Sequence, residues 1–179
     1  MKKTILINGL IAGFIVTAMM VISSALCYND PNFKGSMVLG YLGMLLAFSF
    51  VFVGIKSYRD KHNSGIITFG KAFKIGLLIT LIASTAYVAV WLVEYYFFIP
   101  DFMEKYTAHI LKQAAESGAT VAEIQAQTNE MEMYKEWYKN PILVVILTYA
   151  EVLPIGLIVT LISALILKRN QKPENYTTA

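Results

Sequence analysis

Long hydrophobic stretches alternate with short polar ones along the chain. A hydrocarbon core of about 30 Å needs about 20 apolar residues in a helix, and four segments reach that length. Helices of soluble cores rarely run this far without a polar face, so we predict four transmembrane helices. The predicted spans are residues 5–26, 36–55, 75–98 and 142–167.

The first apolar segment has a second interpretation. The N-terminus "MKKTILINGLIAGFIVTAMMVISSALC" begins with lysines, and Ser23, Ser24 and Ala25 resemble the small residues of a signal-peptide cleavage site. The uncharged stretch is longer than the 7–15 residues or so of a typical signal peptide. We therefore favour a retained first span over a cleaved leader.

The polar segment 101–140 between the third and fourth spans has helical periodicity. Gly118 predicts a helix stop, and Thr120 with Glu123 forms a capping box that opens a second helix. We predict a helical hairpin, which either packs on its own protein or offers a surface to a protein partner. Its apolar stripes are Phe102, Tyr106, Ile110 and Ala114, then Val121, Ile124, Met131 and Tyr134.

Charge predicts the orientation of the spans. The chain has 56% hydrophobic and 15% charged residues with a net charge of +3. Basic residues favour the cytoplasmic side, so both termini are predicted inside and the hairpin outside. One side carries Lys2, Lys3, Lys56, Arg59, Lys61, Lys71, Lys74, Lys168, Arg169 and Lys172. The other carries Lys34, Lys105, Lys112, Lys135 and Lys139.

Two acidic residues interrupt the predicted spans. Glu151 lies about 15 Å from Pro141 along the helix, near the bilayer midplane, and Glu94 is shallower. A bare charge at the midplane is costly, so we expect Glu151 to face the bundle interior and to be protonated at pH 7. Either Glu151 belongs to a structural polar patch or it is a proton- or cation-responsive site. Its predicted neighbours are Thr148, Tyr149 and Tyr95.

Pro154 lies in the same helix as Glu151. Proline leaves the carbonyl of Ala150 without its usual donor and favours a kink. A protonated Glu151 or a water satisfies that carbonyl in the structural interpretation.

Small residues recur at four-residue spacing in the spans and predict close helix packing. We favour packing within the chain, with a homo-oligomer as the alternative. The stripes are Ala72, Gly76, Thr80 and Ser84, then Gly156, Thr160 and Ala164, with Gly9 and Gly13 in the first span.

Little in the sequence predicts enzymatic chemistry. Cys27 is the single cysteine, and His109 has no metal-ligand partner at suitable spacing. We expect no metal, no cofactor and no nucleic-acid partner; the lipid bilayer is the expected environment.

Several stretches are similar to a known family: "GIITFGKAFKIGLLIT", "MEKYTAHILKQAAESGATVAEIQ" and "MYKEWYKNP". The whole chain resembles the bacterial membrane family catalogued as domain of unknown function 4199. The resemblance implies a four-helix inner-membrane protein and no particular reaction. We therefore expect one membrane domain over residues 1–179, an all-α bundle that acts by interaction or membrane organisation without enzymatic activity. The alternative is a small proton-coupled transporter that uses Glu151.

Overall fold

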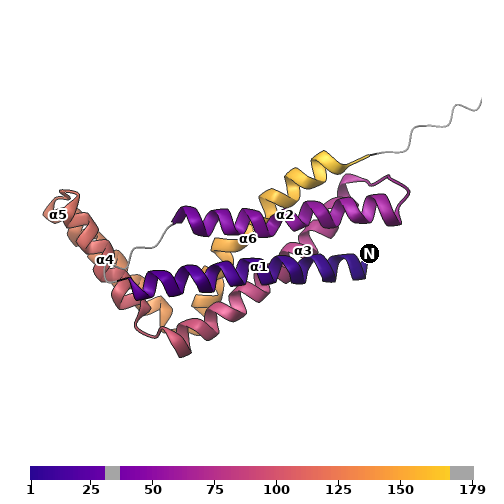
Figure 1. The fold of residues 1–179 in the computed structure, drawn as a ribbon. Coiled ribbons are helices and arrows are strands. Elements are labelled where there is room, and N and C mark those ends of the chain that lie inside the picture. The colour runs from indigo at the N-terminus through magenta and orange to yellow at the C-terminus, as the bar shows by residue number, and fades with distance from the viewer. Residues whose placement is uncertain (31–36, 170–179) are drawn as a thin grey trace, which may run out of the picture.

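Four long apolar helices form the body of the protein in a computed structural model, which describes residues 1–30 and 37–169 (Figure 1). All four are long and apolar enough to cross a membrane, which confirms the predicted all-α, multi-pass class. A short π-helix, η1, extends α3 over Glu94–Phe98. The four helices are α1 (Lys2–Asn29), α2 (Met37–His62), α3 (Phe69–Val93) and α6 (Pro141–Leu167).

The helices extend beyond the apolar segments that predicted them. α2 continues to His62 because the polar residues after Ile55 include neither glycine nor proline until Gly65. α3 begins at Phe69, where the Thr68 side chain accepts a hydrogen bond from the Lys71 backbone N–H. The predicted start of the second span at Ser36, and the charges of Lys34 and Lys172, lie outside the described residues.

Glycines let α1 pack closely on α3. A Cβ added at Gly9 would lie 2.9 Å from Ile82 Cβ, and one at Gly13 would lie 3.1 Å from Ala86 Cβ. A side chain at either position would push the helices apart. α2 packs against α1 and α6, and α6 against α3, which closes the four-helix bundle.

The predicted small residues of α3 and α6 meet at one crossing, which we call the packed seam: Gly76, Thr80, Gly156 and Thr160. The Thr80 hydroxyl lies 3.0 Å from the Thr160 hydroxyl and donates to the Gly156 carbonyl at 3.3 Å. The fully buried Phe48 ring lies against Gly156, where an added Cβ would be 2.9 Å from it. Ser84, Ala72 and Ala164 are also buried.

Two polar helices, α4 (Phe102–Glu116) and α5 (Val121–Tyr138), pack against each other and project from one end of the bundle (Figure 1). Gly118 lies between them with φ +81°, a conformation that favours glycine. The Thr120–Glu123 capping box is present in full. Val121 departs from its predicted apolar stripe: it is 86% exposed, because it occupies the first turn next to the connecting loop.

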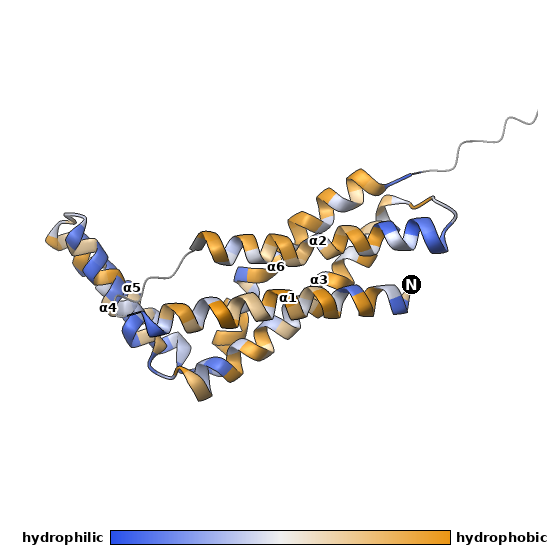
Figure 2. Cartoon of the chain, viewed as in Figure 1, coloured by the Kyte–Doolittle hydropathy of each residue, from blue (hydrophilic) through white to orange (hydrophobic). Residues whose placement is uncertain are grey.

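The opposite end of the bundle is held by polar contacts. Ile67 and Arg169 exchange two backbone hydrogen bonds of 2.8 and 3.0 Å, which join the α2–α3 turn to the end of α6. The Arg59 guanidinium donates to the Leu167 carbonyl at 3.4 Å, near the C-terminus of α6. Hydrophilic residues gather at this end and on α4 and α5, whereas the lengths of the four long helices are mainly hydrophobic (Figure 2).

Candidate binding cavity

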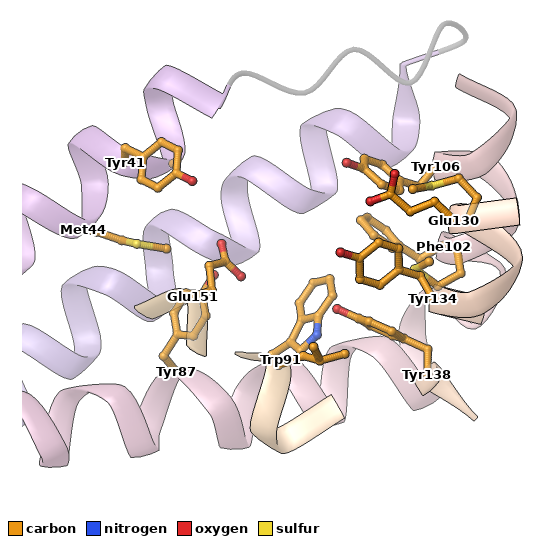
Figure 3. A pocket seen from close by; sticks show the side chains of 14 residues that line it. Tyr41, Met44, Tyr87, Trp91, Phe102, Tyr106, Glu130, Tyr134, Tyr138 and Glu151 are labelled. Carbon is orange, nitrogen blue, oxygen red and sulfur yellow. The ribbon is translucent and has the colours of Figure 1, made fainter. Parts of the chain in front are cut away.

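A cavity of about 670 Å³ lies where the bundle meets α4 and α5 (Figure 3). Five helices contribute to its wall. Tyr41 and Met44 come from α2, Tyr87 and Trp91 from α3, and Glu151 from α6. α4 and α5 supply the remaining side. Its volume falls within the range of about 300–1,000 Å³ that is typical of small-molecule sites.

Aromatic side chains dominate the wall of the cavity. Trp91 and Phe102 meet edge to face with ring centroids 5.3 Å apart, which joins α3 to α4. Tyr95 packs edge to face on Tyr138, with ring centroids 5.1 Å apart. The tyrosines that line the cavity are Tyr41, Tyr87, Tyr106, Tyr134 and Tyr138.

Two carboxylates reach the same cavity from opposite sides. The side chains of Glu151 on α6 and Glu130 on α5 both border the open space in Figure 3. Neither forms an ion pair or a hydrogen bond with any residue in the part of the chain that the structure describes. The two acids therefore place two carboxyl groups beside aromatic faces without a basic partner from the described residues.

Glu151 faces this cavity, whose wall includes residues of α2 and α3, so its side chain points inward between the helices of the bundle. The residue is exposed, although it lies on a helix of the bundle. The physical reason is the size of its neighbours, because Tyr87 and Trp91 on α3 occupy the level where small residues would let α6 close on α3. Its protonation at pH 7 stays a prediction. α6 is continuous through Pro154.

The predicted neighbours of Glu151 lie elsewhere. Thr148 is buried, and its hydroxyl donates to the Val144 carbonyl of its own helix at 2.7 Å. The Tyr149 hydroxyl lies 2.7 Å from that of Thr85 on α3. Tyr95 is buried beside Tyr138 and is not part of the cavity wall. Thr148, Tyr149 and Tyr95 therefore do not line the cavity with Glu151.

Glu94 belongs to a separate polar contact at the start of η1. The Ser24 hydroxyl of α1 donates to Glu94 Oε1. The other carboxylate oxygen, Oε2, is buried without a hydrogen-bond partner among the described residues. Glu94 thus joins α3 to α1 and does not reach the cavity with Glu151.

A cluster at the end of α1 fixes the start of α4. The Tyr28 hydroxyl donates to Asp101 Oδ1 at 2.6 Å, and Lys105 Nζ lies 3.3 Å from Asp101 Oδ2. The Lys105 ammonium also lies 3.6 Å from the centroid of the Tyr28 ring. The hydrogen bonds from Tyr28 and then Lys105 hold the pKa of the Asp101 carboxyl below its usual range. These contacts position α4 over the cavity.

Burial and negative charge act together on the tyrosines of α4 and α5. Burial, followed by the charge of Glu151, raises the pKa of Tyr138 to about 12. Burial also raises the pKa of Tyr106, with smaller effects from Tyr134, Glu130 and Glu151. Both hydroxyls therefore stay protonated at neutral pH and remain able to donate hydrogen bonds.

Some residues of this cavity were not predicted from the sequence. Tyr106 and Tyr134 were predicted on apolar helix faces, and Glu151 was predicted as an unusual acid. Glu130 and Tyr41 had no distinguishing pattern, since Glu130 is one of several acids on α5 and Tyr41 is one aromatic residue in an apolar span. Five helices contribute to the cavity, and no residue spacing within a single helix predicts where they meet.

The fold and the cavity define a multi-pass helical membrane protein with a helical insert over one end. The chain belongs to the family described as protein of unknown function (DUF4199), whose model matches residues 7–169, as the sequence resemblance predicted. No curated protein and no solved structure matches the chain.

Proposed function

We propose that this chain is a non-enzymatic binding protein of the bacterial inner membrane, with both termini cytoplasmic and with α4 and α5 on the outer side. It acts by interaction, and the cavity beneath α4 and α5 is where that interaction takes place. The observation that carries the proposal is that the cavity ends inside the bundle, because the packed seam and Phe48 lie directly inward of it.

The residues beyond the inner end of the cavity are buried, which supports binding rather than transport. Glu151 borders the cavity, and Gly156, five residues further along α6, is already in the packed seam against Phe48. Three residues near the packed seam have no exposed surface: Val51, Ile75 and Ile79. A ligand that reaches Glu151 from the outer side thus meets a closed wall of side chains.

A small proton-coupled transporter is the second candidate, and one observation favours it. Glu151 is an intramembrane acid that faces an open cavity, and such acids often mark proton or ion pathways. Pro154 in the same helix also removes a backbone hydrogen-bond donor, which makes α6 easier to bend there. This alternative requires that the packed seam opens during a cycle.

Cysteine accessibility tests both the orientation and the closed end. In a Cys27→Ser background, single cysteines replace Leu147 in the cavity wall, Ser117 between α4 and α5, and Thr160 in the packed seam. A membrane-impermeant thiol reagent added outside intact cells is expected to label the first two. Thr160→Cys is expected to stay unlabelled from either side.

The possible outcomes separate the two candidates. Labelling of Ser117→Cys only after permeabilisation would reject the orientation. Labelling of Thr160→Cys from the cytoplasmic side, with Leu147→Cys labelled from outside, would reject the closed binding cavity and support transport. Asn63→Cys, in the turn after α2, is the matched control and should be labelled only from the cytoplasmic side.

A further inference from the structure

The chemistry of the cavity narrows the class of ligand. Among the described residues, no lysine, arginine or histidine lines it, whereas Glu151 and Glu130 both do. Binding of a cation would favour the ionised form of both carboxyl groups, and no basic side chain of the described residues lines the cavity to do the same. An anionic ligand would meet two like charges, and a neutral ligand would leave both carboxylates without a charged partner.

The faces of aromatic rings are a second feature of the cavity that favours a cationic ligand. Tyr87, Trp91 and Tyr134 border the same space as the carboxylates (Figure 3). The negative faces of aromatic rings attract cations, and tryptophan is the strongest such side chain. Rings that are held by edge-to-face contacts, such as the Trp91–Phe102 pair, keep these faces in place before a ligand arrives.

The volume of the cavity is the third feature, and it indicates how large the ligand is apart from its charged group. A cavity of about 670 Å³ is much larger than an inorganic cation or a single ammonium group needs. Met44, Met103 and Met131 add flexible apolar surface to the wall. The cavity therefore matches a molecule that joins a positive charge to an apolar or aromatic body.

We propose that the cavity binds an organic cation: a protonated or quaternary amine, or a similar onium group, carried on an apolar body, with Glu151 and Glu130 as its charge partners and Trp91 as a stacking face. This inference rests on the proposed binding function and adds the class of ligand to it. Two sources share this chemistry: a soluble organic cation, and the ammonium headgroup of a membrane lipid.

Tetraphenylphosphonium is a suitable probe, because tetraphenylborate has the same shape and the opposite charge. Trp91 and Trp137 are the two tryptophans of the chain, so a Trp137→Phe protein keeps Trp91 in the cavity wall as its single fluorescent reporter. The full chain in nanodiscs is titrated with each ion. Saturable quenching is expected with the phosphonium, and binding of the borate should be at least about tenfold weaker.

Variants assign the charge partners. Glu151→Gln and Glu130→Gln are each expected to weaken phosphonium binding about tenfold or more, the effect of losing one charged partner. Glu132→Gln is the matched control, because Glu132 is an exposed acid on the same helix as Glu130 and does not line the cavity. Thermal unfolding of each variant shows that the fold is retained.

Nanodisc composition distinguishes the two sources of cation. Both nanodiscs contain the same fraction of phosphatidylglycerol, and the remaining lipid is either phosphatidylethanolamine or an uncharged glycolipid without an amine, so the surface charge is equal. If phosphatidylethanolamine weakens phosphonium binding relative to the glycolipid, the occupant is a lipid headgroup. Equal binding in both assigns the site to a soluble cation. The inference is overturned if no saturable binding occurs, if the borate binds as well as the phosphonium, or if the Glu151 and Glu130 variants bind like Glu132→Gln. Tighter binding of the borate, with Leu147→Cys still labelled from outside, would leave the proposed binding function standing and reject the cation alone.

Discussion

α3 and α6 meet in two regions that differ in side-chain size. In the packed seam they touch through Gly76, Gly156 and two threonines, and the Thr80 hydroxyl donates to the Gly156 carbonyl. Toward α4 and α5, the same helices carry Tyr87, Trp91 and Glu151 and border a cavity. One pair of helices thus makes a closed wall at one level and an open site at another, because small residues give way to large ones along α3.

Phe48 separates the two regions. Its ring comes from α2, is fully buried, and lies against Gly156 just inward of the cavity. Met44, one turn earlier on α2, already lines the cavity. The boundary between a rigid support and a binding space is therefore about one helical turn wide, which favours a site held in place by the seam beneath it.

The largest effect is expected from filling the seam. In Gly156→Leu the new Cβ would lie 2.9 Å from two carbons of the Phe48 ring, so the helices must separate. We expect the free energy of unfolding to fall by about 1–3 kcal/mol, as for overpacked cores. Gly76→Leu should act in the same way, and more strongly than Leu77→Gly, because an added Cβ would lie 2.7 Å from Thr160 Cγ2. Thermal unfolding in detergent measures each change.

Gly70→Leu is the control for both glycine variants, because no atom lies within 4 Å of an added Cβ at that position. It introduces the same side chain into α3 without a collision. If Gly156→Leu unfolded at the same temperature as Gly70→Leu, the close approach of α3 and α6 would be wrong.

The sequence predicted the seam better than the cavity, and the reason is physical. Close helix contact needs small residues at four-residue spacing, so Gly76, Thr80, Gly156 and Thr160 formed a local pattern. The four spans were predicted equally well, because a run of about 20 apolar residues is visible within the sequence of each helix alone. A cavity depends on which residues of five helices fall at one level, and Glu130 lies 21 residues from Glu151 on another helix. No spacing within one helix encodes that arrangement.

A second effect belongs to the cavity region and depends on pH. The pKa of Tyr138 is raised from 10.0 to about 12, mainly by burial, so the folded state favours the protonated hydroxyl. Its contribution to stability is complete below pH 10 and is lost as the pH rises from 10 to about 12. We expect the wild type to lose on the order of 1 to 2 kcal/mol more than Tyr138→Phe across this range. Chemical unfolding at pH 9 and at pH 11.5 measures it.

Tyr41→Phe serves as the control for the alkaline experiment, because Tyr41 is a 52% exposed tyrosine of the same cavity. It should lose as much stability as the wild type. Equal alkaline losses for wild type and Tyr138→Phe would show that Tyr138 is not held in a poorly solvated position. The packed seam, made of glycines and threonines, should add nothing to this pH dependence.

A smaller effect is expected from the hydrogen bonds of the seam. Thr80→Val keeps the shape but removes the hydroxyl that lies 3.0 Å from Thr160 and donates to Gly156. Interhelical hydrogen bonds in membranes contribute about 0.6 kcal/mol on average and about 1.7 at most. A double-mutant cycle with Thr160→Val measures the coupling. Ser49→Ala, which removes an exposed hydroxyl bonded within its own helix, is the control. A coupling of zero would assign the seam to van der Waals packing alone.

The smallest effect is expected from Glu151→Leu, which places the same new side chain on α6 five residues before Gly156. If Glu151 belonged to a structural polar patch, Glu151→Leu would destabilise the protein by leaving its polar partners unpaired. The structure gives Glu151 no hydrogen bond among the described residues and an open cavity beside it, so the opposite follows. We expect the free energy of unfolding in detergent to change by less than about 0.5 kcal/mol or to rise, as for sites away from packed contacts. Glu151→Gln, which keeps the shape of the side chain, should behave alike. A loss above about 1 kcal/mol in Glu151→Leu alone would mean that Glu151 is held by polar partners, and the contrast between an open cavity and a packed seam on α6 would then fail.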